Sequence, residues 1–98
     1  MKLALSRVAE FLSATGEFDL HAIAQGYSIE SRTIKPGELF FAVKGERMDG
    51  HDYVRQALEK GAVAAVVRQD QLKSYPAKAG LLAVDDTLAA LQTLGSSV

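Results

Sequence analysis

Two continuous apolar runs, separated by a helical pattern, constrain the fold of this chain more than any other feature. The runs occupy residues 39–43 and 62–67 and are apolar at every position. Such runs are typical of strands that are buried on both faces of a sheet. A strand, a helix and a second strand within about thirty residues form a βαβ unit, so the two strands are predicted to be parallel.

The segment between the runs has the pattern of an amphipathic helix over residues 50–60. Val54, Ala57 and Leu58 share one face of such a helix at positions i, i+3 and i+4. Asp49 directly precedes the segment and is the predicted N-cap. The sequence therefore supplies the crossover helix that a parallel pair of strands requires.

Local signals predict the remaining elements and the fold class. They are a short first helix with Ser6 as its N-cap and Gly16 as its left-handed stop, a strand at 27–31, a short helix around Gln71, a strand at 81–84 and a last helix from about Asp86. Residues 17–25 fit a strand or a turn. We predict one α/β domain over residues 1–98, a small three-layer fold with a parallel or mixed sheet of about four strands flanked by helices.

Composition excludes several classes of protein. With 98 residues, 48% of them hydrophobic and 23% charged, the chain has the composition of an ordinary globular domain. A net charge of -1 provides no field that would attract nucleic acid or an anionic membrane, and neither is a predicted partner. The chain has no cysteine, which excludes disulfides and thiolate chemistry and favours a reducing compartment, so the predicted location is cytoplasmic.

The sequence lacks the common catalytic and phosphate-binding motifs. It contains no Gly-x-x-x-x-Gly-Lys-Ser/Thr loop, no Gly-x-Gly-x-x-Gly, no His-Glu-x-x-His and no nucleophile elbow. His51 is predicted to bond locally in the first helical turn, because no nucleophile and carboxylate accompany it. Asp85 and Asp86 precede the last helix and are interpreted as structural, with Asp86 as the N-cap candidate. We therefore predict no catalytic residue and no metal ligand.

Two polar segments at strand ends are the candidate ligand-binding elements. At Glu30, Ser31 and Arg32 a hydroxyl, a backbone amide and a guanidinium could converge on one anion or sugar edge. The alternative is that Ser31 satisfies turn amides and that Arg32 pairs with Glu30 or Glu38. Residues 44–50 follow a buried strand and precede a helix whose free amides could hold a phosphate, or they form a solvated connection.

Residues 30–33, 35–53 and 57–62 together resemble the N-terminal domain of the Mur ligases. These enzymes add amino acids to the UDP-linked muramoyl peptide of the bacterial cell wall. Within the family, residues 44–52 are most similar to the MurF branch, which adds D-alanyl-D-alanine to UDP-N-acetylmuramoyl tripeptide. The MurE branch, which differs in the amino acid added, is the alternative. Glu30 is a departure, because the family usually has Asp there.

The resemblance implies a role for this domain within a larger enzyme. The domain would bind the UDP end of the UDP-N-acetylmuramoyl peptide, while a central ATPase domain of the same polypeptide binds ATP and Mg²⁺. The complete enzyme would be an ATP-dependent amide ligase that works through an acyl phosphate, and the 98 residues alone would hold no cofactor and catalyse nothing. The predicted substrate-binding residues, from the residue patterns and the family together, are Ile29, Ser31, Arg32, Gly45, Glu46, Arg47 and Met48.

Two other classes of function remain open from the sequence. Similar small α/β domains precede the catalytic domains of HPr kinases, so a regulatory or ligand-binding module without catalysis is one hypothesis. A protein-interaction module without a small ligand is the other. The UDP-sugar hypothesis differs from both because it requires the two polar segments to meet at one rim of the molecule.

Overall fold

The computed structural model describes residues 2–16, 18–19, 21–45, 48–75 and 80–97. No described helix is long and apolar enough to cross a membrane. In chain order the elements are β1 (Leu3–Ala4), α1 (Leu5–Leu12), β2 (Ile23–Ala24), β3 (Tyr27–Ser28), β4 (Leu39–Phe41), η1 (Gly50–Tyr53), α2 (Val54–Glu59), β5 (Ala64–Arg68), η2 (Gln69–Ser74), β6 (Leu81–Val84) and α3 (Thr87–Ser97). The helices named η are 3₁₀ helices.

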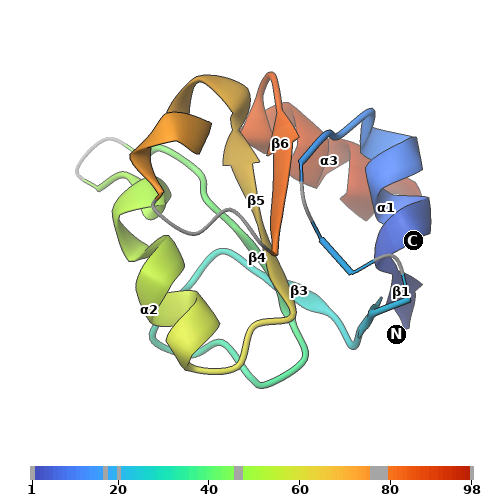
Figure 1. Ribbon diagram of the computed structural model, residues 1–98, viewed down its shortest axis with the longest axis horizontal. Helices are drawn as coiled ribbons and strands as arrows, with labels where there is room; N and C mark the ends of the chain where they lie inside the picture. Colours follow the sequence, from blue (N-terminus) through green and yellow to red (C-terminus); the bar gives the residue numbers. More distant parts are fainter. Residues whose placement is uncertain (1, 17, 20, 46–47, 76–79, 98) are drawn as a thin grey trace.

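The main sheet has four strands in the order β3-β4-β5-β6, and every neighbouring pair is parallel (Figure 1). The register of the central pair aligns Leu39 with Ala64 and Phe41 with Val66. β1 and β2 form a separate antiparallel pair. The predicted α/β class and parallel sheet are therefore confirmed, and the carboxyl ends of all four main strands lie at one edge of the sheet.

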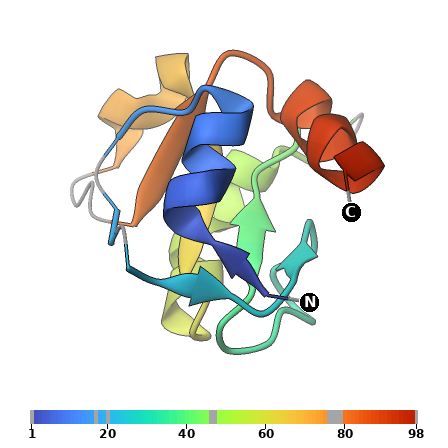
Figure 2. The ribbon, with the colours of Figure 1, turned by 90° about the vertical axis from the view of Figure 1, so that its right-hand side faces the viewer.

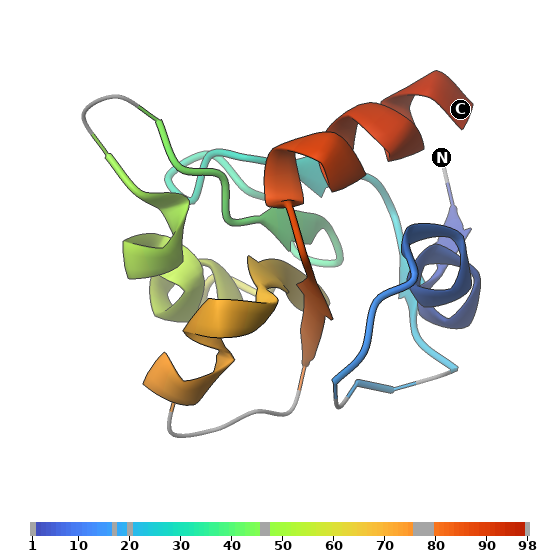
Figure 3. The ribbon, with the colours of Figure 1, turned by 90° about the horizontal axis from the view of Figure 1, so that it is seen from above.

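Helices cover both faces of the sheet and make three layers. α2 lies on one side of the sheet, and α1 and α3 lie on the other (Figures 1 and 3). Successive residues of β4 and the residue after it alternate between the layers: Leu39 and Phe41 join the cluster under α1 and α3, whereas Phe40 and Ala42 join the cluster under α2. This alternation explains why the run is apolar at every position.

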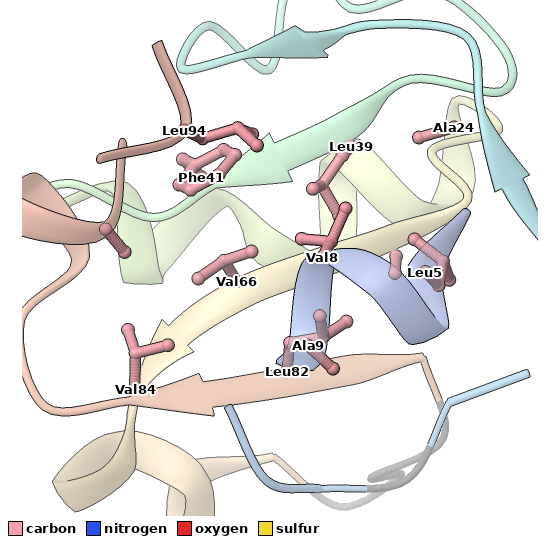
Figure 4. Packing of buried hydrophobic residues seen from close by; sticks show 12 residues of the cluster. Leu5, Val8, Ala9, Ala24, Leu39, Phe41, Val66, Leu82, Val84 and Leu94 are labelled. Carbon is pink, nitrogen blue, oxygen red and sulfur yellow. The ribbon is translucent and has the colours of Figure 1, made fainter. Parts of the chain in front are cut away.

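The larger core cluster joins α1 and α3 to the sheet (Figure 4). Leu5 and Val8 of α1 pack toward Leu39 and Val66, and Leu94 of α3 lies against Phe41. Seen from the side of these helices, α1 crosses in front of the sheet with α3 beside it (Figure 2). Complete burial of an aliphatic or aromatic side chain contributes about 1.5–3 kcal/mol, so this layer is a main source of stability.

The start of α1 differs from the prediction. The N-cap is Ala4, which makes no side-chain capping bond, and Ser6 lies inside the helix. The Leu5 amide donates to the Ala22 carbonyl at 3.0 Å. Because the β1–β2 pairing supplies this partner, the helix needs no hydroxyl cap.

The end of α1 also differs from the prediction. Ser13, with φ of 54°, is the left-handed C-cap in place of Gly16. Gly16 has φ of 121°, and a Cβ there would lie 2.4 Å from the Leu81 carbonyl oxygen. This glycine is required where the chain passes close to β6, just after Thr15 pairs with Ala83.

Later elements agree more closely with the sequence. β6 occupies the predicted residues 81–84, and the Asp86 carboxylate caps α3 by accepting from the Leu88 and Ala89 amides at 3.0 and 3.2 Å. The ambiguous residues 17–25 include β2; residues 17 and 20 lie outside the described part. The predicted helix at 50–60 divides into η1 and α2.

Candidate functional site

A cavity of about 500 Å³ opens where β3 and β4 end, between these strands and the helical segment η1–α2. This volume lies within the range of about 300–1,000 Å³ that is usual for small-molecule sites. Ligands of parallel α/β sheets bind at the carboxyl ends of the strands, which is the position of this cavity. Its lining residues are Ile29, Glu30, Ser31, Arg32, Phe40, Val43, Gly45, Met48, Gly50, Tyr53 and Gln56.

One wall is the β3 loop, which we define as residues 29–32. The Ser28 hydroxyl accepts from the Glu30 amide at 3.0 Å and so ends β3 three residues earlier than predicted. Ser31 is 4% exposed, and its hydroxyl donates to the Gln56 Oε1 at 3.5 Å. A bond of this length is weak, so the Ser31 hydroxyl can exchange its partner at little cost.

Arg32 lies at the rim of the same wall. Its side chain is 75% exposed, and its Nε is 3.5 Å from the Glu30 carboxylate. This is the surface pairing that the sequence offered as the alternative to ligand binding. Exposed pairs contribute about 0–1 kcal/mol, so the guanidinium can leave Glu30 for an anion. The Arg32 carbonyl is fixed, because it accepts from the Lys60 ammonium at 2.8 Å.

The opposite wall is the β4 loop, residues 43–50, of which 43–45 and 48–50 are described. The Gly45 amide donates to the Met48 carbonyl at 2.7 Å, and the Gly50 amide donates to the Val43 carbonyl at 3.0 Å. A Cβ at Gly50 would lie 2.7 Å from the Val43 nitrogen. The loop can therefore close on itself only with glycine at position 50.

His51 anchors the base of the β4 loop and is 6% exposed. Its Nδ1 is 2.6 Å from the Asp49 carboxylate, and its Nε2 accepts from the Arg68 backbone amide at 2.9 Å. Because an amide can only donate, Nε2 is unprotonated and Nδ1 carries the proton. The His51 carbonyl also accepts from the Tyr75 hydroxyl at 3.0 Å. The predicted local hydrogen bond of His51 is therefore confirmed by its contact with Asp49.

This network shifts two pKa values. Partial burial acts to raise the pKa of Asp49, but hydrogen bonds from the His51 amide and ring, with the electrostatic influence of His51 and Lys44, bring the pKa below its usual value. Burial, together with the negative charges of Asp49 and Asp52, raises the pKa of Tyr75 to about 12. Asp49 is therefore ionised and Tyr75 neutral at pH 7, which suits their bonds to His51.

The expectation of free amides at the start of this helix is wrong. The Gly50 amide bonds to the Val43 carbonyl, the His51 amide to the Asp49 carboxylate, and the Asp52 amide to the Asp49 carbonyl. These three amides are therefore bonded within the protein and stabilise the β4 loop. The site consequently depends on side chains and on the walls of the cavity for binding.

The structure brings the two predicted polar segments together. Five of the seven predicted residues line this cavity, and Glu46 and Arg47 lie outside the described residues. The five are Ile29, Ser31, Arg32, Gly45 and Met48. Sequence reasoning missed Phe40, Val43, Gly50, Tyr53 and Gln56 as lining residues. Tyr53 and Gln56 are three residues apart and so share one face of the helical segment, but the sequence does not show that this face turns toward the cavity.

Several known proteins resemble this chain in sequence. The family model described as "Mur ligase family, catalytic domain" matches residues 24–97. The UDP-N-acetylmuramoyl-tripeptide--D-alanyl-D-alanine ligase of Bacillus subtilis (strain 168) is 34% identical over 99% of this chain and 21% of its own length. The UDP-N-acetylmuramoyl-L-alanyl-D-glutamate--2,6-diaminopimelate ligase of Aquifex aeolicus (strain VF5) is 42% identical over 68% of this chain and 13% of its own length.

Solved structures that resemble this chain come from the same family as these relatives. A crystal structure of MurF from Acinetobacter baumannii matches 96% of this chain with a TM-score of 0.76 and 28% identity, over 20% of its own length. MurF from Thermotoga maritima in complex with ADP matches 76% of this chain with a TM-score of 0.65 and 28% identity, over 16% of its own length. The chain belongs to the Mur ligase family. It spans about a fifth of the length of the MurF relatives that it matches.

Proposed function

We propose that this chain is the N-terminal, substrate-binding domain of an ATP-dependent MurF-type ligase. Such an enzyme would add D-alanyl-D-alanine to UDP-N-acetylmuramoyl tripeptide, and the cavity between the β3 and β4 loops would hold the UDP end of that substrate. The B. subtilis ligase named for this reaction matches 99% of the chain, which supports the MurF type. The A. aeolicus relative supports a MurE-type ligase as the alternative.

The observation that carries the proposal is the composition of the cavity that both loops line. Its inner wall includes the fully buried Phe40 and the partly buried Val43 and Tyr53, and the nearly buried Ser31 adds a hydroxyl. Arg32 supplies a positive charge at the rim. A nucleotide has a flat ring that suits apolar walls and a diphosphate that suits a guanidinium.

The domain would contribute orientation to the reaction. By holding the remote nucleotide, it would place the peptide carboxylate near ATP, and such positioning can contribute several kcal/mol to catalysis. The sequence has no phosphate loop for ATP, and no group of three or more metal-binding side chains occurs among the described residues. We assign ATP and Mg²⁺ to the remainder of a full-length enzyme, which we expect to be cytoplasmic.

The test is a titration of the ¹⁵N-labelled chain with UDP, followed by amide NMR. We expect shifts concentrated at Ser31, Gly45, Gly50 and Gln56, with millimolar affinity because the other domains are absent. Uridine and inorganic diphosphate, titrated separately, should each reproduce part of the pattern. Shifts scattered over η2 and α3, or none at high concentrations of UDP, would instead favour a regulatory or protein-interaction module.

A further inference from the structure

We propose that Gln56, together with the Ser31 hydroxyl, binds the polar edge of the uracil ring inside the cavity. The inference rests on the proposed function and adds a base-contacting residue that the sequence did not indicate. It also fixes the direction of the ligand, with the ring inside and the diphosphate at the rim.

The Gln56 side chain is placed for contact with a ligand. It lies on α2, is half-buried and lines the cavity. Within the described residues, its amide makes one hydrogen bond, from the Ser31 hydroxyl at 3.5 Å. A primary amide has two N–H donors and a carbonyl with two lone pairs, so described protein groups take up little of its bonding capacity. A ligand with complementary groups would replace solvent and one weak protein bond at this side chain.

The charges around the cavity determine which end of a nucleotide enters. Among the described lining residues, the charged ones are Glu30 and Arg32, whose side chains are 48% and 75% exposed. A diphosphate that entered past them toward Phe40 would lose water without gaining a cation from a described residue. The uncharged uracil ring can enter the cavity past Glu30 and Arg32 without this cost of desolvation. The diphosphate would then remain within reach of the Arg32 guanidinium.

The polar edge of uracil matches the two side chains. That edge presents a carbonyl, an N3–H donor and a second carbonyl in a row. The Gln56 carbonyl can accept from N3–H while its amide donates to one ring carbonyl, and the Ser31 hydroxyl can donate to the other. The partly exposed Val43 side chain and the aromatic ring of Tyr53 would contact the faces or edges of the ring that carry no polar groups.

The experiment measures the affinity of the 98-residue chain for three nucleotides by NMR titration. The probes are UDP, 3-methyluridine diphosphate, which lacks the N3–H donor, and 2′-deoxyuridine diphosphate, which lacks a ribose hydroxyl. We expect the 3-methyl compound to bind about 5- to 50-fold more weakly than UDP, as for the loss of one or two hydrogen bonds. The 2′-deoxy compound should bind like UDP.

Variants connect this effect to the side chain. Gln56→Leu should weaken UDP binding by a similar factor but should not weaken the 3-methyl compound further, because the two changes remove the same bond. Gln56→Glu keeps the size of the side chain and removes its donors, so it should also weaken UDP binding. Gln69→Leu, an exposed change on η2 outside the cavity, is the matched control and should have no effect.

The possible results separate this inference from the function on which it rests. If the native chain binds UDP and Gln56→Leu binds it equally well, the inference is wrong and the proposed function stands. Sensitivity to the 2′-deoxy change without sensitivity to the 3-methyl change would also overturn it, because Gln56 would then face the ribose. If the native chain does not bind UDP, both proposals fail.

Discussion

The β3 loop and the β4 loop line the same cavity but are held in different ways. In the β4 loop and its anchor His51, the amides of Gly45, Gly50 and His51 bond at 2.7, 3.0 and 3.0 Å, and the His51 ring has partners at 2.6 and 2.9 Å. In the β3 loop, the side chains of Ser31 and Arg32 meet protein partners at 3.5 Å.

The difference separates the support of the site from its binding groups. Polar groups that are fully bonded within the protein have little to offer a ligand, and breaking their bonds is costly. Groups with long bonds can exchange a protein partner for a ligand partner. We therefore expect substitutions at the β4 loop to reduce stability, and substitutions at the β3 loop to reduce ligand binding with little change in stability.

The largest expected effect is that of His51→Ala on stability. The change leaves the Asp49 carboxylate and the Arg68 amide without the ring and creates a cavity, so the free energy of unfolding should fall by about 2–4 kcal/mol. Urea denaturation would measure the change. His21→Ala, at an exposed position, is the control and should shift the value by less than about 0.5 kcal/mol. Equal effects of the two variants would contradict the distinction between the loops.

A smaller effect is expected when the pH is lowered. The pKa of Asp49 is lower in the folded chain than in the unfolded chain, so the unfolded chain binds a proton at this carboxyl more readily. The ionised carboxylate therefore stabilises the folded chain. The resulting stabilisation is fully present above the unfolded pKa of about 3.9 and is lost as the pH falls through the folded pKa. The free energy of unfolding, measured between pH 7 and pH 2, should decrease less steeply below pH 4 in Asp49→Asn than in the native chain.

The smallest effect on stability is expected for Arg32→Ala. The side chain is largely exposed and its ion pair is long, so the free energy of unfolding should change by less than about 0.5 kcal/mol. The affinity for UDP should nevertheless fall, and uridine binding should not change, because the guanidinium would act on the diphosphate. Arg55→Ala, at an exposed position on α2, should alter neither quantity. A loss of stability above 1 kcal/mol would show that the β3 loop also supports the fold.

The sequence predicted best the features that depend on near neighbours along the chain. The limits of β6 and the Asp86 cap followed from an apolar run with an acidic residue just after it. The parallel pairing of β4 and β5 followed from the spacing of two continuous apolar runs. Membership of the Mur ligase family was also predicted, because it depends on a motif that is nearly contiguous in the sequence. Both polar loops belong to that motif, and the hypothesis of a shared ligand required them to meet.

Features that depend on distant partners could not be predicted. Ser6 has the chemistry of an N-cap, but the Ala22 carbonyl, sixteen residues away from it in the sequence, satisfies the start of α1 instead. The free amides expected before α2 are used by Val43 and Asp49. Gln56 could be assigned to a helix but not to the cavity, because its direction depends on how α2 packs on the sheet.

The pairing of Thr15 with Ala83 affects how the chain behaves at high concentration. β6 is an outer strand of the sheet, and free backbone groups on an outer strand can recruit a strand from another molecule. The Ala83 amide and carbonyl are both bonded to Thr15, at 2.6 and 3.0 Å. An incoming strand would have to displace Thr15 before it could pair with the middle of β6. Thr15, a single residue outside the main sheet, thus protects this edge of the sheet against intermolecular β-aggregation.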